Sequence, residues 1–357
     1  EKIRHELVTL TRTAPVLLVL EDLHWADASS LRVLRHVCAH VEACRILVLC
    51  TWRRGDQAEA LADAAEGLAR RHSTHLDLER LSADDASVLL RCLAGDDLDP
   101  AITSTLLDRT EGNPFFLVEY ARLARDEGNL AGLRDAMPRT IADVLQRRIR
   151  SLPNDTAAAL TAGSVIGREF DVALLASALE TSELVVLDLL EAALDADLVH
   201  DLGGDRFRFG HALVRDSAYA ELAPSRRERM HAAVAEILGT ANADRAPEVA
   251  RHWAAAGDRF VHRAWRAAAH AGQVAMGAYA AEEAVGHYSS ALDLLERDGE
   301  ATPRQRWDLL VGYAEACRWS TRLLEAAAAI DEAIAIADQL GEPAMVVGAA
   351  TVAADGA

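Results

Sequence analysis

The run of apolar residues Val16–Leu20, followed directly by Glu21 and Asp22, constrains the fold of this chain most strongly. A continuous run of this length, rich in Val and Leu, predicts a strand buried on both faces, as in parallel α/β sheets. Such sheets bind their ligands outside the carboxyl ends of the strands. Two acids at that edge are placed to hold Mg²⁺ beside a nucleoside triphosphate. A core strand that ends in two solvated acids has the same pattern, and both interpretations stay open.

The following residues extend the α/β pattern. Residues 29–43 predict an amphipathic helix, and residues 45–51 predict a second buried strand. A strand, a helix and a strand in this order predict a βαβ unit with parallel strands. A further helix is expected over 57–71 and a short strand over 74–78, after which the α/β signal ends.

A longer motif includes the acidic pair. The sequence Leu-His-Trp-Ala-Asp over Leu23–Asp27 follows the two acids, and Ser29, Ser30 and Leu31 come next. The whole stretch resembles the Walker B region of the signal-transduction ATPases called STAND proteins, and within them the large ATP-binding regulators of the bacterial LuxR family. Trp25 is expected to pack against the core, and Asp27 is expected to cap the helix that begins near Ser29.

The resemblance implies roles for particular residues. Residues 1–80 would form the C-terminal half of a P-loop NTPase core that uses ATP and Mg²⁺. Glu21 would be the acid on the metal side, and Asp22 the acid that orients the attacking water. Arg53, at the end of the second strand, corresponds to a sensor of the terminal phosphate. Its neighbour Arg54 is an alternative candidate for this role. The other interpretation is that Arg53 is simply a solvated arginine at the end of a strand.

The phosphate-binding loop of such a core is absent from the sequence. A Walker A loop needs a glycine-rich turn followed by a lysine, because backbone N–H groups and the ammonium group hold the phosphates together. No glycine precedes Gly55, and Lys2 is the only lysine. We expect a fragment that begins at Glu1 inside a nucleotide-binding domain. The competing explanation is a degenerate ATPase that has lost the loop.

Residues 81–137 have helical periodicity only and predict a helical lid. Its pattern breaks at residues 96–100 and again at Gly112, Asn113 and Pro114. A glycine and a proline directly before a new helix leave backbone N–H groups facing outward. The segment resembles the Gly-x-Pro motif of STAND proteins, which implies a position near the base and sugar of the nucleotide. Without that context, it predicts an ordinary turn.

Residues 138–222 predict helices followed by a two-stranded hairpin with a Gly-Gly turn, which indicates a winged-helix-like module. The module contains 8 arginines and 14 acidic residues, a balance that disfavours contact with DNA. His211 corresponds by resemblance to a histidine that approaches the nucleotide in related ATPases. A histidine that caps or packs near a helix start is the ordinary alternative.

Residues 223–357 are rich in alanine and helical throughout. The small residues Ala284 and Ala291, with Tyr288 between them, recur 42 positions later as Ala326, Ile330 and Ala333. Small residues at helical spacing let paired helices approach closely, which predicts repeats like those of tetratricopeptide (TPR) proteins. Such an array offers a surface to an inducer or to a protein partner.

Composition excludes several classes of protein. The net charge is −19, which argues against a chain built to neutralise nucleic acid. No apolar run approaches the ~20 residues that a membrane helix needs, so no membrane contact is expected. The five cysteines form no C-x-x-C pair, which suggests reduced thiols. We therefore expect a soluble, cytoplasmic protein.

Together, these patterns predict a partial P-loop α/β sheet followed by a mostly α chain with a lid, a winged-helix-like module and TPR-like repeats. The resemblance implies a slow ATPase that acts as a switch between ATP and ADP states, with ATP-dependent self-association. It also implies a transcriptional regulator that would reach DNA only through a C-terminal domain outside this sequence. The alternatives are a helical interaction scaffold with a degenerate ATPase core, an ATP-dependent enzyme with high turnover, and the STAND module of a multidomain cyclase or kinase.

Overall fold

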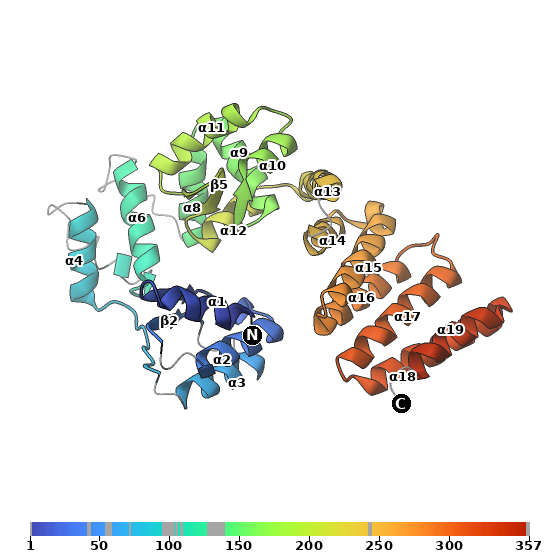
Figure 1. Cartoon of the computed structure of the whole chain (residues 1–357). Helices are drawn as coiled ribbons and strands as arrows, with labels where there is room; N and C mark the ends of the chain where they lie inside the picture. Colours follow the sequence, from blue (N-terminus) through green and yellow to red (C-terminus); the bar gives the residue numbers. More distant parts are fainter. Residues whose placement is uncertain are drawn as a thin grey trace. The chain divides into compact units, whose positions relative to one another are not determined.

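The computed structural model (Figure 1) divides the chain into two compact units, Glu1–Glu79 and Arg80–Ala357. Each unit is described by itself. None of the described helices combines the length and the apolar character needed to cross a membrane. The structure describes residues 2–40, 44–53, 59–70, 73–94, 104, 106–107, 110–126, 140–241 and 245–354.

The first unit contains a parallel βαβ arrangement. Its elements are α1 (Lys2–Thr11), β1 (Val16–Leu20), the short 3₁₀ helix η1 (Leu23–Trp25), α2 (Ala28–His40), β2 (Ile46–Cys50) and α3 (Glu59–Ala69). Strands β1 and β2 pair in parallel, with Val16 opposite Ile46 and Leu20 opposite Cys50. The predicted βαβ unit is therefore confirmed.

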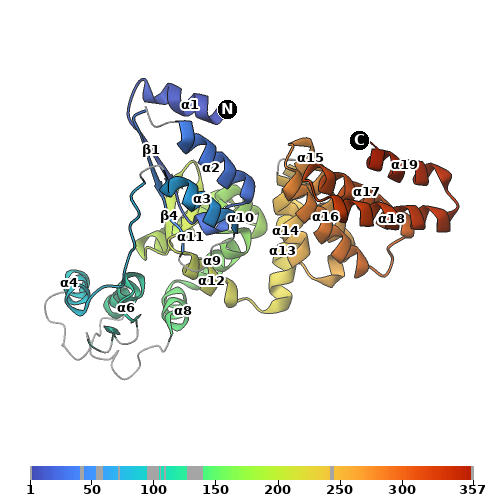
Figure 2. The same cartoon turned by 90° about the horizontal axis from the view of Figure 1, so that it is seen from below.

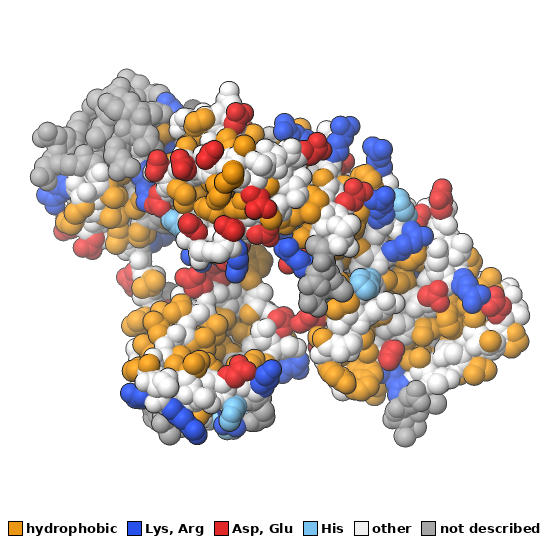
Figure 3. Space-filling model, turned by 45° about the horizontal axis from the view of Figure 1, so that its top comes forward, with side chains coloured by type: hydrophobic (Ala, Val, Ile, Leu, Met, Phe, Trp, Pro, Cys, Tyr) orange, Lys and Arg blue, Asp and Glu red, His pale blue; other side chains and the backbone are white. Residues whose placement is uncertain are grey.

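Only one face of this two-stranded sheet is covered. Val48 and Cys50 pack against the core residues Leu31, Leu34 and Leu61, which come from α2 and α3. The alternate side chains point to the other face and are exposed to solvent. Their exposed fractions are 61% for Leu17, 45% for Val19, 65% for Leu47 and 48% for Leu49. Figure 3 shows hydrophobic side chains on the surface of this unit. The prediction that these strands are buried on both faces is wrong for the described part of the unit.

The segment after α3 also differs from the prediction. The expected strand over 74–78 is not formed, and residues 73–82 have no regular structure. Leu76 and Leu78 are 74% and 94% exposed. An alternating pattern forms a strand only when a neighbour pairs with it, and no described strand does so here.

The second unit begins with the helices of the predicted lid, α4 (Ala83–Ala94) and α6 (Pro114–Asp126). They pack through a small core that includes Leu90, Leu117 and Tyr120. The predicted break before Pro114 is confirmed, whereas the break over 96–100 lies outside the described residues.

A central module follows, and we use this name for α8 to α12 and their sheet. It contains α8 (Ile141–Ser151), α9 (Asn154–Ile166), β3 (Glu169–Asp171), α10 (Val172–Ala178), α11 (Glu183–Asp195), β4 (Val199–Gly203), β5 (Arg206–Phe209) and α12 (Ala212–Ala220). The predicted helices and hairpin are confirmed. The sequence did not indicate β3, which pairs with β5 to complete an antiparallel sheet in the order β3-β5-β4.

The helices from Pro224 to Ala354 form what we call the helical array, and they lie side by side in Figures 1 and 2. The array contains α13 (Pro224–Ala241), α14 (Ala246–Ala255), the 3₁₀ helix η3 (Asp258–Phe260), α15 (Val261–Gly277), α16 (Ala281–Glu296), α17 (Pro303–Trp319), α18 (Leu323–Leu340) and α19 (Pro343–Ala354).

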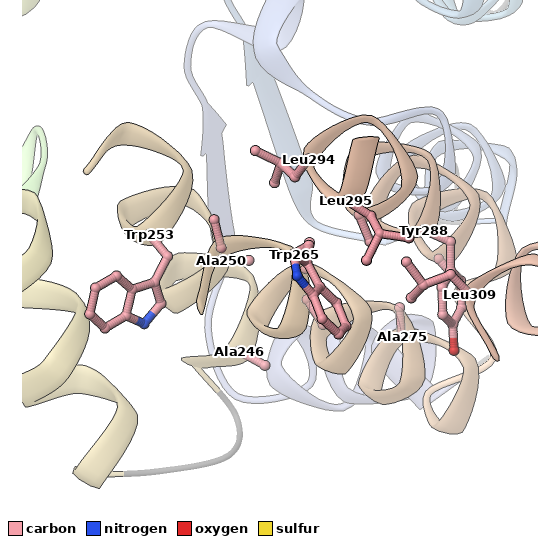
Figure 4. Packing of buried hydrophobic residues seen from close by; sticks show 14 of the residues in the cluster. Ala246, Ala250, Trp253, Trp265, Ala275, Tyr288, Leu294, Leu295 and Leu309 are labelled. Atoms are coloured by element: carbon pink, nitrogen blue, oxygen red, sulfur yellow. The ribbon is translucent and has the colours of Figure 1, made fainter. Parts of the chain in front are cut away.

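Small residues let these helices approach one another (Figure 4). Tyr288 on α16 lies against two glycines, one on α15 and one on α17. A Cβ atom at Gly272 would lie 2.8 Å from the Tyr288 ring, and one at Gly312 would lie 2.7 Å from it. Both contacts are shorter than carbon atoms allow, so the glycines make room for the tyrosine ring.

The predicted repeat offset of 42 residues is confirmed in the backbone. Ala280, which precedes α16, has φ −94° and ψ 62°, and Arg322, which precedes α18, has φ −87° and ψ 63°. The Ala280 N–H donates to the Ala275 carbonyl, as the Arg322 N–H does to the Cys317 carbonyl. The repeated alanines are buried in both copies.

Each of these turns places one residue in the left-handed region. The residues are Tyr279 (φ 60°) after α15 and Thr321 (φ 66°) after α17, and Gly341 (φ 67°) occupies the same position after α18. This is the Schellman arrangement, in which glycine is the favoured residue because other L-residues meet their own carbonyl group. The array therefore contains two strained turns and one unstrained turn of the same kind.

We expect Tyr279→Gly to raise the free energy of unfolding by about 0.5–1 kcal/mol, because it relieves the left-handed backbone and the Tyr279 side chain is 86% exposed. Gly341→Ala should lower it by about 1 kcal/mol for the opposite reason. Urea unfolding followed by circular dichroism checks both. Tyr279→Ala is the control, and an equal gain for that variant would show that backbone strain is not the cause.

Candidate functional site

The two acids lie where the ends of both parallel strands are tied together. The Asp22 N–H donates to Thr51 Oγ1 at 3.0 Å, and the Leu23 N–H donates to the Thr51 carbonyl at 2.8 Å. The Thr51 N–H in turn donates to the Leu20 carbonyl at 3.0 Å. Asp22 has a left-handed backbone (φ 56°), which turns the chain sharply at the end of β1. The acid pair therefore lies at the carboxyl edge of the sheet, directly beside Thr51.

Thr51 is a site residue that the sequence did not single out. A single threonine after a strand carries no signal until the strand pairing is known, because only the pairing of β1 with β2 brings it to the turn at Asp22. The predicted residue Arg53 lies two positions further along the same edge and is exposed. Glu21 is exposed and Asp22 is half-buried, so both carboxyl groups are within reach of solvent.

The residues after the acids have different roles. The Ser30 N–H donates to Asp27 Oδ1 at 2.8 Å, so Asp27 caps α2 as predicted. Burial raises the pKa of the Asp27 carboxyl, but the hydrogen bonds from the Ser30 hydroxyl and from backbone N–H groups outweigh it and the pKa falls below its ordinary value. Trp25 is 78% exposed, so the expectation that it packs in the core is wrong. Both ring nitrogens of His24 are buried without a hydrogen-bond partner in the described part of the chain.

This edge fits one half of a magnesium-nucleotide site. Mg²⁺ at such sites takes one or two carboxylates and obtains its other ligands from water and phosphate oxygens. Glu21 and Asp22 supply two carboxylates, with the Thr51 hydroxyl beside them. No described group of three or more His, Cys, Asp and Glu side chains could hold a metal by itself. The residues therefore fit the metal side, whereas the sequence contains no loop for the phosphates.

In the second unit, the Gly-Asn-Pro turn is tightly built. Gly112 has φ +73°, and a Cβ atom there would lie 2.4 Å from the Leu81 carbonyl oxygen. The Leu81 N–H donates to the Gly112 carbonyl at 2.9 Å. Arg80 and Glu111 form an ion pair next to this hydrogen bond. Only glycine fits at position 112, so the irregular segment before α4 is held against the turn that precedes α6.

The start of α6 already uses N–H groups of this turn. Asn113 Oδ1 accepts a hydrogen bond from the Phe115 N–H at 3.0 Å, and the Asn113 N–H donates to the Thr110 carbonyl at 2.9 Å. Pro114 has no N–H to donate. The geometry is thus that of a capped helix start. The N–H groups of Asn113 and Phe115, which the sequence suggested would face outward, have hydrogen-bond acceptors within the chain.

His211 caps α12 and lies against the same helix start. Its Nδ1 atom accepts a hydrogen bond from the Leu213 N–H at 3.2 Å. Its ring stacks on Phe115, with the ring centres 3.8 Å apart and 21° between the planes. The structure therefore brings His211 together with the Gly-Asn-Pro turn through Phe115, one residue after Pro114.

A buried ion pair fastens the middle of α6 to the central module. Glu119 and Arg148 are both 2% exposed and form a salt bridge. Arg148 also donates to the Ala196 carbonyl at the end of α11. Arg122 bridges Glu119 at 3.2 Å and pairs with Asp197. Helix α6 is thus held at its start by Phe115 and at its centre by these charges.

Of the comparisons with known proteins, the one with solved structures found a likeness. No protein-family model matches the sequence, and no curated protein matches it. Among solved structures, the chain is similar to a signal-transduction ATPase with numerous domains (STAND) with a tetratricopeptide repeat sensor from Pyrococcus horikoshii. The TM-score is 0.47 at 11% identity, and the match covers 98% of this chain. The chain spans about half of that protein, 53% of its length.

We expect Gly112→Ala to destabilise the second unit by about 1–3 kcal/mol, because the added Cβ meets a backbone carbonyl and the left-handed conformation is strained. Thermal unfolding measures this change. Gly277→Ala is the control, since nothing lies within 4 Å of a Cβ there. Equal stability of the two variants would show that the turn tolerates a Cβ atom at position 112.

Arg148→Met should cost about 3–5 kcal/mol, because it leaves the buried Glu119 carboxylate with only the longer contact to the partly exposed Arg122 and removes the hydrogen bond to the Ala196 carbonyl. The double variant Arg148→Met/Glu119→Leu should recover much of this loss, since no buried charge remains unpaired. Arg150 on the same helix is 67% exposed, so Arg150→Met should cost at most about 1 kcal/mol. Urea unfolding compares the three, and similar losses for Arg148→Met and Arg150→Met would refute the buried-pair argument.

Proposed function

We propose that this chain is the regulatory portion of a STAND-type, nucleotide-dependent switch, in which Glu21 and Asp22 face Mg²⁺-ATP. The observation that carries the proposal is the tie between Asp22 and Thr51, since it fixes an acid pair and a hydroxyl at the carboxyl edge of two parallel strands. Ligands of parallel α/β sheets bind at that edge. ATP and Mg²⁺ are thus the proposed cofactors, with Arg53 near the terminal phosphate.

The uncovered sheet face supports a larger α/β domain. Parallel sheets occur with both faces covered, and two parallel strands alone do not make a stable sheet. Four large side chains of β1 and β2 are nevertheless exposed on one face, namely Leu17, Val19, Leu47 and Leu49. We therefore propose that further strands and helices of a P-loop core complete this unit and supply the phosphate-binding loop.

The coupling through α6 supports a switch rather than a simple enzyme. In the proposal, Gly112, Asn113 and Pro114 lie near the base and sugar of the nucleotide. Any shift of this turn would reach the central module through the stack of Phe115 on His211, the Glu119–Arg148 pair and the Arg122–Asp197 pair. In the proposed switch, α6 has two positions, and a bound nucleotide changes the equilibrium between them.

The finer proposal concerns the complete protein. We propose that the central module, through the order α9-β3-α10-α11-β4-β5 within it, is a winged helix, and that the TPR-like array receives an inducer or a protein partner. Helix α11 exposes Glu183, Asp188 and Glu191, so its surface does not suit DNA. Binding to DNA by a LuxR-type regulator would therefore depend on a separate domain.

A second candidate function is a helical interaction scaffold with a degenerate ATPase core. The observation that favours it is the absence of a glycine-rich loop with a following lysine from this sequence. The hydrogen bonds at the turn before α6 also suit a purely structural role. The two candidates differ in whether ATP binds to the complete protein.

We expect a protein that combines this chain with a Walker A loop to bind ATP and to hydrolyse it slowly. Asp22→Asn should lower its hydrolysis rate by about 100-fold or more, because a carboxylate that orients water is lost. Single-turnover hydrolysis with radiolabelled ATP measures this rate.

Glu66→Gln is the matched control, because Glu66 is an exposed acid on α3 of the same unit. Its hydrolysis rate should equal that of the wild type. A complete protein without a Walker A loop or ATP binding would favour the scaffold. Many turnovers per second would instead indicate an enzyme rather than a switch.

A further inference from the structure

Two histidines meet inside the joint between the central module and the helical array. His231 lies on α13 and His252 on α14, and they are 2% and 0% exposed. Helix α13 is the first helix of the array and packs on α9 and α10 of the module as well as on α14, the next helix of the array. The two rings therefore link the first two helices of the array at the place where the array meets the module, and no residue of the candidate nucleotide site takes part.

A chain of hydrogen bonds runs through both rings. An Arg251 guanidinium nitrogen lies 2.9 Å from His252 Nε2, and His252 Nδ1 lies 2.9 Å from His231 Nδ1. His231 Nε2 in turn lies 2.8 Å from the Tyr219 hydroxyl on α12. Four side chains from α12, α13 and α14 are thus linked in one line.

Proton counting gives this line one consistent direction. When Arg251, which can only donate, donates to Nε2 of His252, the His252 proton sits on Nδ1; the Ile166 carbonyl also faces the His252 ring. The Nδ1 proton is then donated to His231 Nδ1, and the His231 proton sits on Nε2, where it is donated to the Tyr219 oxygen. In this arrangement both rings are neutral, each in one tautomer. A second proton on either ring would place two N–H groups face to face.

The charges around the rings oppose any added positive charge. Arg215 donates to the Ser164 carbonyl at 2.8 Å, Arg251 to the Ile166 carbonyl at 2.9 Å, and Arg227 to the carbonyls of Tyr219 and Leu222 at 3.3 and 3.2 Å. These acceptors lie at the carboxyl ends of α9 and α12, where helix dipoles favour cations. The arginines therefore cap helices, and their positive charge disfavours a metal ion on the two histidines.

The other charged groups of the joint do not change this conclusion. Asp216 pairs with Arg215 at 3.0 Å, Glu248 faces Arg251 and pairs with Arg245, and Arg245 lies near His252. Burial, reinforced by the charge of Arg251, lowers the pKa of His231 to about 4 and that of His252 to about 3. Neither ring accepts a proton near neutral pH while the joint is closed.

We propose that His231 and His252 form a proton-sensitive latch, which holds the helical array on the central module while both rings are neutral and releases it when they are protonated. Opening the joint exposes both rings to water, where a histidine titrates near pH 6.5. Above that pH, both rings are neutral in both states, and protons do not change the equilibrium between the closed and the open joint. Below it, protonation of each ring raises the equilibrium constant for opening by up to about tenfold per pH unit, or about 100-fold for the pair.

The prediction is a local loss of protection when the pH falls. Hydrogen exchange of α13 and α14, corrected for the intrinsic pH dependence, should accelerate by about 100-fold per pH unit between pH 6 and pH 5. Exchange in α17, which lies away from the joint, should change far less. Equal acceleration in all helices, or none in α13 and α14, would overturn the latch.

Variants test whether the two rings cause the change. The double variant His231→Leu/His252→Leu removes both titrating groups and should abolish the acid-dependent exchange. His270→Leu, on the exposed side of α15, is the control and should behave as the wild type. An unchanged acid response of the double variant would refute the proposal.

The wild-type protein gives a second test that needs no substitution. Nitrogen-15 NMR of labelled histidines should show the proton of His252 on Nδ1 and that of His231 on Nε2, with both rings neutral at pH 6. A charged ring at pH 6, or the reverse tautomers, would refute the proposal. This measurement decides the question if the double variant does not fold.

Discussion

Glu119 and Arg148 are removed from water almost completely, and their salt bridge is the main stabilisation of both charges, with Arg122 beside Glu119 and the Ala196 carbonyl beside Arg148. Displacing one partner of such a buried pair is costly, because the other charge stays buried with weaker partners. The pair therefore opposes sliding of helix α6 along α8. With Phe115 stacked on His211, the helix has two fixed points on the central module. Coupling between the Gly-Asn-Pro turn and the module would then occur by release and re-formation of these contacts, as in other bistable elements.

The acidic edge of the first unit depends on the hydrogen bonds that Thr51 forms with the turn after β1. Thr51 binds the backbone of both Asp22 and Leu23, so the turn after β1 is shaped by the residue that follows β2. The left-handed conformation of Asp22 is held by these bonds, and such strain is common at functional sites. In the proposed switch, the neighbouring strand thus positions the acid. The ring nitrogens of His24, which find no hydrogen-bond partner among the described residues, and the exposed Trp25 lie just beyond this turn.

Much of the architecture follows from local sequence patterns, and what does not follow has physical causes. The βαβ unit, the helices of the module and the repeat of Ala284 in Ala326 were predicted, because periodicity and small residues fix them. The burial of both faces of β1 was predicted wrongly. An apolar run indicates that both faces of a strand favour burial, but it does not show whether helices or strands are present to cover them. The turns at Tyr279 and Thr321 carry no glycine and gave no signal. Thr51 and the pair His231–His252 depend on long-range contacts that no local pattern encodes, and the roles of Gly112 and His211 toward a nucleotide stay predictions.

One consequence of the array concerns where it can be divided. The Tyr288 ring touches helices on both sides, since Gly272 and Gly312 make room for it. A boundary drawn between α16 and α17 would leave half of that ring without cover. Repeats taken from this array for engineering, or exchanged in evolution, should therefore be transferred as α15, α16 and α17 together. The segment that must be transferred as a whole, Val261–Trp319, is thus longer than the 42-residue period of the sequence repeat.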